Sequence, residues 1–267
     1  MAKFSIIVVC LNAGERLHDT IASIRSQSCK DYEIIVKDGI STDGSIEKLM
    51  TDERLRVIRQ KDRGIYDAMN QAVKKAQGEY IYFLNCGDLF HNSDVLQQVK
   101  EQMEKETKAE KEKKYIFYGD IYQRLTKERV ASNPSMDAFG CYRNVPCHQA
   151  CFYASSLMRE KEFDTKYKVR ADYEHFLWCF FRGGAETVYM PVLTADYEGG
   201  GFSETKENRK ISAREHREIV GKYMPKGQVL KYRLAMALTF ARFRTWLAEN
   251  EMTSHAYNRI KDRVYRR

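Results

Sequence analysis

The chain has 267 residues, of which 43% are hydrophobic, 31% charged and 12% aromatic, a composition that excludes a disordered chain and allows a sizeable core. No apolar run reaches the roughly 20 residues that a membrane-spanning helix needs. The formal charge of +8 comes entirely from residues 221–267, with 11 Lys/Arg and 3 Asp/Glu, because the first 220 residues hold 34 of each sign.

Strand and helix patterns alternate through the first third of the chain. Phe4–Cys10 is a continuous apolar run, which is typical of a strand covered on both faces. We expect further strands at residues 34–36, 55–58 and 81–84, and helices at 14–28 and 65–76. This alternation predicts an α/β fold with a mostly parallel, Rossmann-like central sheet flanked by helices.

Two acids follow predicted strands of this sheet. Asp38 ends the strand that begins near Tyr32, and a turn rich in Gly, Ser and Thr comes next. Asp88 closes the turn Asn85–Asp88 after the fourth strand. Ligands of open α/β sheets bind beyond the carboxyl ends of the strands, so the two acids predict a nucleotide with a metal ion on its phosphates. A carboxylate that only caps the next helix remains the alternative for Asp38.

The second half is less regular. Residues 100–114 mix Lys and Glu and predict a solvated surface, residues 115–152 are rich in β-forming residues, and residues 172–182 and 187–192 predict a helix and a strand. Gly199–Gly201, followed by Phe202 and Ser203, is a candidate lid, with an ordinary flexible turn as the alternative.

The basic tail predicts a helix over residues 226–250 with two apolar sides. Leucines and alanines form one side, and aromatic residues with Met236 form the other, with Lys and Arg between them. One side can pack on the body of the protein. The aromatic side then needs a second apolar surface, for which an anionic membrane interface and a homodimer are the two candidates.

The cysteines indicate a reducing compartment, because seven is an odd number and their spacing forms no disulfide framework. Cys141, Cys147, His148 and Cys151 lack the close pairs of a structural zinc site, so we interpret them as scattered thiols. The N-terminus lacks the cleavage region of a signal peptide. We therefore expect a cytoplasmic protein.

Five segments, in this order, resemble the inverting glycosyltransferases of family two, which have the GT-A fold. They are Ser5–Asn12, Lys37–Ser45, Asp62–Asn70, Asn85–Asp88 and the pair Pro146–Gln149 with Ala171–Glu174. The segment at Asp62 is similar to that of a subgroup that builds bacterial surface polysaccharides. The resemblance implies a GT-A domain over residues 1–223 and a basic, amphipathic helical tail over residues 224–267.

The resemblance also implies roles for individual residues. Asp172 would be the catalytic base, with Glu174 as its local competitor, and Asp88 would bind Mg²⁺ or Mn²⁺. His148, Gln149 and Glu174 would contact the acceptor or the donor diphosphate. The nucleotide-sugar would contact Val9, Leu11, Asn12, Asp38, Gly39, Asp62, Arg63, Asn85 and Gly87.

The expected reaction is transfer of a sugar from a nucleoside-diphosphate-sugar, with UDP as the expected nucleotide, to a hydroxyl of a lipid-linked glycan. Such chemistry belongs to capsule or O-antigen synthesis on the inner face of the cytoplasmic membrane. A positioned carboxylate accepts the proton of the hydroxyl, and a divalent ion stabilises the leaving diphosphate.

Two other classes of protein explain fewer of these sequence features. A sugar nucleotidyltransferase would need a Gly-rich phosphate loop after the first strand, and Asn12–Arg16 is a poor version of it. A non-enzymatic binder of nucleic acid or anionic surfaces would explain the basic tail, but not acids at strand ends, which repel phosphates. We expect no nucleic-acid partner.

Overall fold

The computed structural model describes residues 2–50, 52–107, 113–200, 205–238 and 253. The chain divides into two compact units, residues 1–219 and 220–267. The first unit contains β1 (Phe4–Cys10), α1 (Glu15–Arg25), β2 (Tyr32–Asp38), β3 (Leu55–Arg59), α2 (Ile65–Val73), β4 (Tyr80–Phe83), β5 (Leu89–Phe90), α3 (Val95–Thr107), β6 (Lys114–Gln123), β7 (Glu128–Val130), α4 (Ala138–Arg143), the 3-10 helix η1 (His148–Ala150), β8 (Cys151–Ala154), α5 (Ser155–Glu160), α6 (Ala171–Phe181) and β9 (Ala185–Tyr197). Helix α7 (Lys206–Tyr223) crosses the boundary, and α8 (Lys226–Leu238) lies in the second unit.

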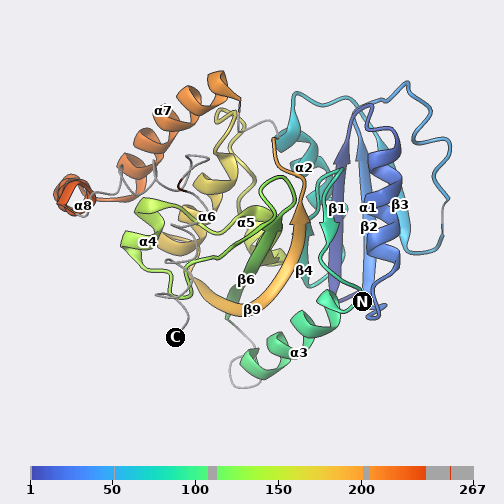
Figure 1. The fold of residues 1–267 in the computed structure, drawn as a ribbon, viewed down its shortest axis with the longest axis horizontal. Coiled ribbons are helices and arrows are strands. Elements are labelled where there is room, and N and C mark those ends of the chain that lie inside the picture. Colours follow the sequence, from blue (N-terminus) through green and yellow to red (C-terminus); the bar gives the residue numbers. More distant parts are fainter. Residues whose placement is uncertain (1, 51, 108–112, 201–204, 239–252, 254–267) are drawn as a thin grey trace. The chain divides into compact units, whose positions relative to one another are not determined.

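Among the described residues the strands form one nine-stranded sheet in the order β3-β2-β1-β4-β8-β6-β9-β5, with β7 paired to β6. Strands β3, β2, β1 and β4 are parallel, as the sequence predicts. Beyond β4 the sheet is mixed, because β8 is antiparallel to both β4 and β6, while β9 runs parallel to β6. The expected α/β class is confirmed, and the parallel arrangement describes the first half of the sheet (Figure 1).

Helices cover both faces of this sheet. The apolar residues of α1 and α3 form one core with alternate residues of β1, among them Phe4, Ile6 and Val8. Helix α2 contacts β1 and β2 but its buried residues lie outside that core, which places α2 against the opposite face. All seven residues of β1 are buried, as expected for a strand covered on both sides.

The sheet bends at Gly119 in β6. The pairing of β6 with β9 shifts register between Tyr118 and Ile121, which is the pattern of a β-bulge. A Cβ atom at Gly119 would lie 2.4 Å from the carbonyl oxygen of Val192. Only glycine permits this close approach of two backbones, and the resulting curl of β6 and β9 is visible in Figure 1.

Helix α8 confirms the start of the predicted tail helix, which we expected over residues 226–250. Its leucines Leu230, Leu234 and Leu238 are 57%, 56% and 79% exposed. The rest of the predicted helix lies outside the described residues, as does most of the candidate lid at Gly199–Ser203. Within the described part of the chain, no helix combines the length and hydrophobicity required to cross a membrane.

Candidate active site

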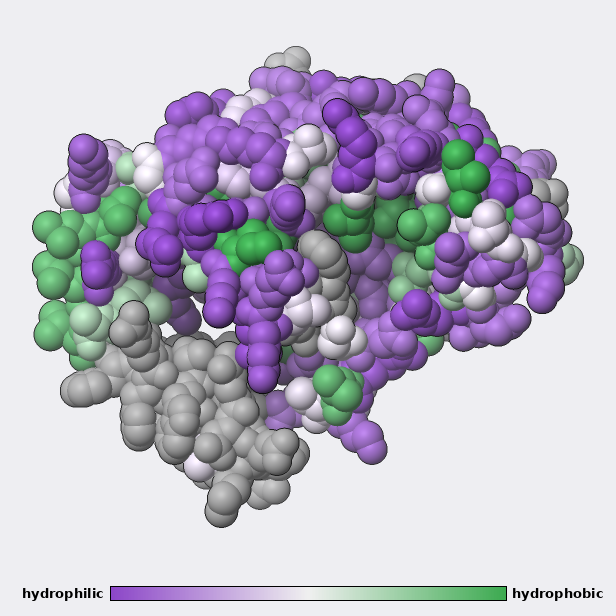
Figure 2. Space-filling model, turned by 90° about the horizontal axis from the view of Figure 1, so that it is seen from above, coloured by the Kyte–Doolittle hydropathy of each residue, from purple (hydrophilic) through white to green (hydrophobic). Residues whose placement is uncertain are grey.

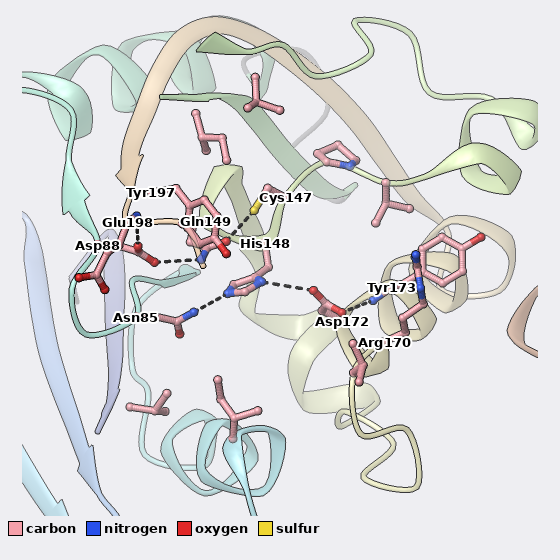
Figure 3. A pocket seen from close by; sticks show the side chains of 18 of the residues that line it. Asn85, Asp88, Cys147, His148, Gln149, Arg170, Asp172, Tyr173, Tyr197 and Glu198 are labelled. Carbon is pink, nitrogen blue, oxygen red and sulfur yellow. Dashed lines mark hydrogen bonds and ion pairs between the residues drawn. The ribbon is translucent and has the colours of Figure 1, made fainter. Parts of the chain in front are cut away.

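A cavity of about 630 Å³ opens at the carboxyl ends of β1 and β4. Seven of the residues predicted from the sequence line it: Val9, Leu11, Asn85, Asp88, His148, Gln149 and Asp172. Figure 3 shows that the acids Asp88 and Asp172 lie on either side of the pair formed by His148 and Gln149. The structure therefore brings together residues that are up to 163 positions apart in the sequence, from Val9 to Asp172.

Asp88 lies in the turn between β4 and β5 and is only 3% exposed. Its Oδ2 accepts a hydrogen bond from Nε2 of Gln149 at 2.9 Å, and its Oδ1 accepts one from the backbone N–H of Glu198 at 2.9 Å. Burial raises the pKa of Asp88, because the charged form loses its hydration, and the two hydrogen bonds only partly offset this. A bound cation would therefore stabilise the ionised form of this buried carboxylate.

Asp172 lies in the first turn of α6, with its side chain 26% exposed. Its Oδ1 accepts hydrogen bonds from the backbone N–H of Tyr173 at 2.8 Å and the hydroxyl of Tyr66 at 3.0 Å. Its Oδ2 lies 3.2 Å from Nδ1 of His148. Burial alone would raise the pKa of Asp172, but the hydrogen bond and electrostatic interaction with His148 and the hydrogen bonds from Tyr173 and Tyr66 lower it overall. Asp172 is thus ionised at neutral pH and can accept a proton.

The tautomer of His148 follows from its second partner. Nδ2 of Asn85 lies 3.0 Å from Nε2 of His148. Because an amide nitrogen only donates, Nε2 is the acceptor, and neutral His148 carries its proton on Nδ1, facing Asp172. The remaining amide oxygen of Asn85 is buried without a hydrogen-bond partner in the described part of the chain.

The backbone of η1 is fixed from two strands. The carbonyl oxygen of Gln149 accepts hydrogen bonds from the hydroxyl of Tyr82 on β4 at 2.5 Å and from Oγ1 of Thr194 on β9 at 3.1 Å. The side-chain oxygen of Gln149 lies 2.6 Å from Sγ of Cys147. With its oxygen occupied in this way, the Gln149 amide directs its nitrogen to Asp88.

The sequence analysis missed Glu215, which lies on α7 and is 4% exposed. Its carboxylate accepts three consecutive backbone N–H groups, from Lys168 at 2.8 Å, Val169 at 3.1 Å and Arg170 at 2.9 Å. This interaction holds the segment that leads into Asp172. No local motif marks Glu215, because its partners lie about 45 residues earlier in the chain.

Asp38 does not line the cavity. It is fully buried, and it accepts hydrogen bonds from the backbone N–H of Ser41 at 3.0 Å and its hydroxyl at 2.5 Å. The guanidinium of Arg59 lies 3.2 Å from its Oδ2. These contacts are those of a turn carboxylate, the alternative that the sequence left open. Of Asp38, Asp88 and Asp172, the cavity lining contains Asp88 and Asp172.

Six other predicted residues also lie outside the cavity lining: Asn12, Gly39, Asp62, Arg63, Gly87 and Glu174. Asp62 forms an ion pair of 2.8 Å with the fully buried Lys37, and Glu174 forms one of 2.7 Å with Lys161. Glu174 is fully buried. Glu174 is thus paired with Lys161 in the protein interior, whereas Asp172, two residues earlier, lines the cavity.

The described residues contain no cluster of three or more His, Cys, Asp or Glu side chains that could by themselves hold a metal ion. All seven cysteines are free. Asp88 nevertheless fits a metal that is shared with a ligand, because each of its oxygens accepts one hydrogen bond and keeps a free lone pair. Mg²⁺ is commonly bound by one or two carboxylates together with substrate phosphates and water.

Comparison with known proteins agrees with this geometry. Residues 5–182 match the family model described as glycosyl transferase family 2. A PGL/p-HBAD biosynthesis glycosyltransferase of Mycobacterium bovis is 33% identical over 250 residues, which cover 91% of this chain and 90% of that protein. An uncharacterized glycosyltransferase of Mycobacterium tuberculosis is 32% identical over 207 residues, or 76% of this chain and 78% of its own.

Solved structures share the fold. Residues 1–349 of S. aureus TarS in complex with UDP superpose with a TM-score of 0.67 at 16% identity, covering 93% of this chain and 75% of that one. The mannosyltransferase PcManGT of Pyrobaculum calidifontis, in complex with GDP-Man and Mn²⁺, gives a TM-score of 0.56 at 14% identity, covering 96% and 84%. The fold is that of a GT-A glycosyltransferase. The chain belongs to glycosyl transferase family 2.

Proposed function

We propose that this glycosyltransferase moves a sugar from a UDP-sugar to a hydroxyl of a lipid-linked glycan acceptor, with inversion at the anomeric carbon, in the synthesis of a cell-surface polysaccharide. One observation carries the proposal. Asp88 and Asp172 line the same cavity, and adjacent residues, Gln149 and His148, hold their carboxylates. A buried acid and an ionised base are the two groups that this reaction requires.

Asp172 accepts the proton of the acceptor hydroxyl as that oxygen attacks the anomeric carbon. Its Oδ2 is the suitable atom, because Oδ1 is already occupied by Tyr66 and Tyr173. A positioned base of this kind contributes about 10²- to 10⁴-fold to the rate. A single displacement of this kind inverts the configuration of the sugar.

Asp88 would hold the divalent cation, either Mg²⁺ or Mn²⁺, together with the donor phosphates. When bound, the ion stabilises the charge that develops on the departing diphosphate. Val9 and Leu11, at the end of β1, form the wall on the nucleotide side. The fold shared with the UDP complex of TarS supports uridine as the base.

The second unit brings the enzyme to the inner face of the cytoplasmic membrane. Leu230, Leu234 and Leu238 recur every fourth residue along α8, so they lie on one face of the helix. Figure 2 shows hydrophobic side chains gathered on α8 at the left of the view. Together with the 11 Lys/Arg of residues 221–267, this exposed face has the chemistry of a helix that binds anionic lipid.

Transfer is tested with a panel of UDP-sugars, by measuring hydrolysis and transfer with wild type, Asp172→Asn and Glu174→Gln. Asp172→Asn should abolish transfer and keep UDP binding. Glu174→Gln is the matched control and should retain turnover in the folded protein, because its carboxylate lies outside the cavity. Wild-type turnover by Asp172→Asn would refute the role of Asp172. Pyrophosphate-forming synthesis of a UDP-sugar from UTP would instead identify a nucleotidyltransferase.

Membrane binding is tested by flotation with anionic and neutral liposomes. Wild type should bind the anionic vesicles, and a Leu230→Ser/Leu234→Ser variant should bind them at least tenfold less. If the variant binds equally well but loses self-association in analytical ultracentrifugation, α8 is a dimer contact instead.

A further inference from the structure

Tyr66 has no role in the proposed mechanism, yet its hydroxyl contacts the proposed catalytic base, Asp172. It lies on α2 and lines the cavity. Its hydroxyl lies 3.0 Å from Oδ1 of Asp172 and 2.9 Å from the carbonyl oxygen of Val169. These partners lie 106 and 103 residues further along the chain, so the contact depends on the tertiary fold.

A second residue of α2 forms hydrogen bonds with the chain segment that leads to Asp172. Asn70 lies one helical turn after Tyr66, on the same face of the helix. Its side-chain nitrogen donates to the carbonyl oxygen of Phe163 at 2.9 Å, and its oxygen accepts from the N–H of Phe163 at 2.9 Å. Helix α2 thus holds both ends of residues 163–172, which lead into the base.

We propose that Tyr66 is a positioning residue that orients Asp172 and stabilises its ionised form. The inference rests on the proposed role of Asp172 as the base. The phenol has one proton and two acceptors. While Asp172 is charged, the proton faces its carboxylate, because a charged acceptor forms the stronger hydrogen bond. Once Asp172 has taken the proton of the acceptor, the hydroxyl can rotate to the Val169 carbonyl. A donor at this position therefore keeps a partner in both states.

The surroundings allow this arrangement. Burial and the negative charge of Asp172 hold the pKa of Tyr66 well above its ordinary value, so the phenol remains a donor throughout the physiological range. In the described part of the chain, the titratable groups that interact electrostatically with Asp172 are His148 and Cys147 from η1 and its preceding turn, Cys151 and Tyr153 from β8, and Tyr66 from α2. Glu215 of α7 interacts in the same way with Tyr66. Arg170 is the nearest cation in sequence, and its guanidinium is bonded to Ser212 at 2.7 Å.

The test compares Tyr66→Phe with Tyr32→Phe. Tyr32 is 3% exposed on β2, and its hydroxyl has no hydrogen-bond partner among the residues that the structure describes, so its removal is the same chemical change without a lost hydrogen bond. Kinetics are measured from pH 4.5 to 7.5, UDP affinity by calorimetry, and folding by thermal denaturation.

Tyr66→Phe should lower kcat about 5- to 20-fold and leave UDP affinity unchanged, as expected for loss of one hydrogen bond to a charged group. The ratio of its kcat/KM to that of wild type should be about threefold lower at pH 4.5 than at pH 7.5. The reason is that removing a hydrogen-bond donor raises the pKa of the base. Tyr32→Phe should keep a ratio near one at every pH.

A ratio that does not change with pH would overturn the inference, even if Tyr66→Phe lowered the melting temperature, because that combination indicates a purely structural role. The proposed function is assessed separately. It fails if Asp172→Asn turns over like wild type, whereas an inactive Asp172→Asn beside a pH-independent Tyr66→Phe rejects only the role of Tyr66.

Discussion

The side-chain nitrogen of Gln149 lies 2.9 Å from Oδ2 of Asp88, and the preceding residue, His148, makes the corresponding contact with Asp172. Two adjacent residues thus contact both acids of the cavity. In the proposed mechanism, the first contact acts on the diphosphate side and the second on the acceptor side. Substitution of each residue should therefore affect a different kinetic quantity.

Gln149→Ala should weaken metal-dependent UDP binding by about 10- to 100-fold, the usual effect of losing a residue that orients a metal ligand. His148→Ala should leave that affinity within about twofold and lower kcat, because it removes a donor from Asp172. Calorimetry with UDP and Mn²⁺, together with steady-state kinetics, measures both. Equal effects of the two variants on binding would contradict this division.

Asp88→Asn should make the stability of the ligand-free protein less dependent on pH. Burial raises the pKa of Asp88 in the folded state above its unfolded value, so folded protein binds this proton more tightly. The stability associated with it is full below the unfolded pKa of about 3.9 and is lost as pH rises through the raised folded pKa. Asparagine does not titrate, so it lacks this loss of on the order of 1 kcal/mol. It also offers one oxygen to two donors, from Gln149 and Glu198, which lowers stability equally at every pH.

Thermal denaturation of Asp88→Asn and wild type between pH 4 and 8 tests this expectation. The stability of the variant relative to wild type should increase as pH rises, and the variant should bind UDP no more tightly with Mn²⁺ than without it. A constant difference in melting temperature across the range would show that the Asp88 carboxylate pays no desolvation cost.

Glu215→Gln should destabilise the protein and slow transfer. A neutral amide offers one oxygen to three backbone N–H groups, so at least one buried donor loses its partner, at about 1–3 kcal/mol. Glu218→Gln is the matched control on the same helix, because its side chain is 53% exposed and pairs with Lys166 at the surface. Urea denaturation and kcat measure the effects, and equal losses for both variants would remove the special role of Glu215.

Gly87→Ala should disrupt the turn that carries Asp88. Gly87 has φ of +99°, and an added Cβ would lie 2.4 Å from a carboxylate oxygen of Glu198. Gly44 has φ of +77° with open space around it, so Gly44→Ala introduces backbone strain of about 1–2 kcal/mol without the clash. Both variants should be destabilised, but only Gly87→Ala should lose UDP affinity. Retained affinity in Gly87→Ala would show that Glu198 can move aside freely.

Asp38→Asn should act on stability and not on the choice of nucleotide. Its carboxylate is committed to Ser41 and Arg59, so the variant should lose about 1–3 kcal/mol of unfolding free energy. Ser41→Ala, which removes one partner and keeps the acid, should reproduce part of that loss. The ratio of UDP to GDP affinity should stay constant in both, and a tenfold change in that ratio for Asp38→Asn alone would return this residue to base recognition.

Local patterns predicted the first half of the fold well. The apolar run of β1 was expected at the observed residues, and the helix expected over 65–76 is α2 over Ile65–Val73. These elements carry their own periodicity. The order of the later strands could not be predicted, because β8 is inserted between β4 and β6 through pairings that no local pattern encodes.

Prediction of the site from local sequence patterns has the same limit. Asp88, Asp172, His148 and Gln149, which line the cavity, were predicted because each stands in a short motif. Tyr66 and Glu215 were missed because their importance arises from contacts with the segment 163–172, which only the tertiary fold creates. Asp38 illustrates the converse. Its position at a strand end suggested a ligand contact, while the hydroxyl and N–H of Ser41, three residues later, satisfy it locally.

The carbonyl oxygen of Gln149 accepts one hydroxyl from β4 and another from β9, so the backbone of the residue that holds Asp88 is bonded to both halves of the sheet. Residues elsewhere around the cavity can therefore change over generations without displacing this anchor. Selection for a new glycan acceptor would then proceed by exchanging loop residues around an unaltered reaction centre.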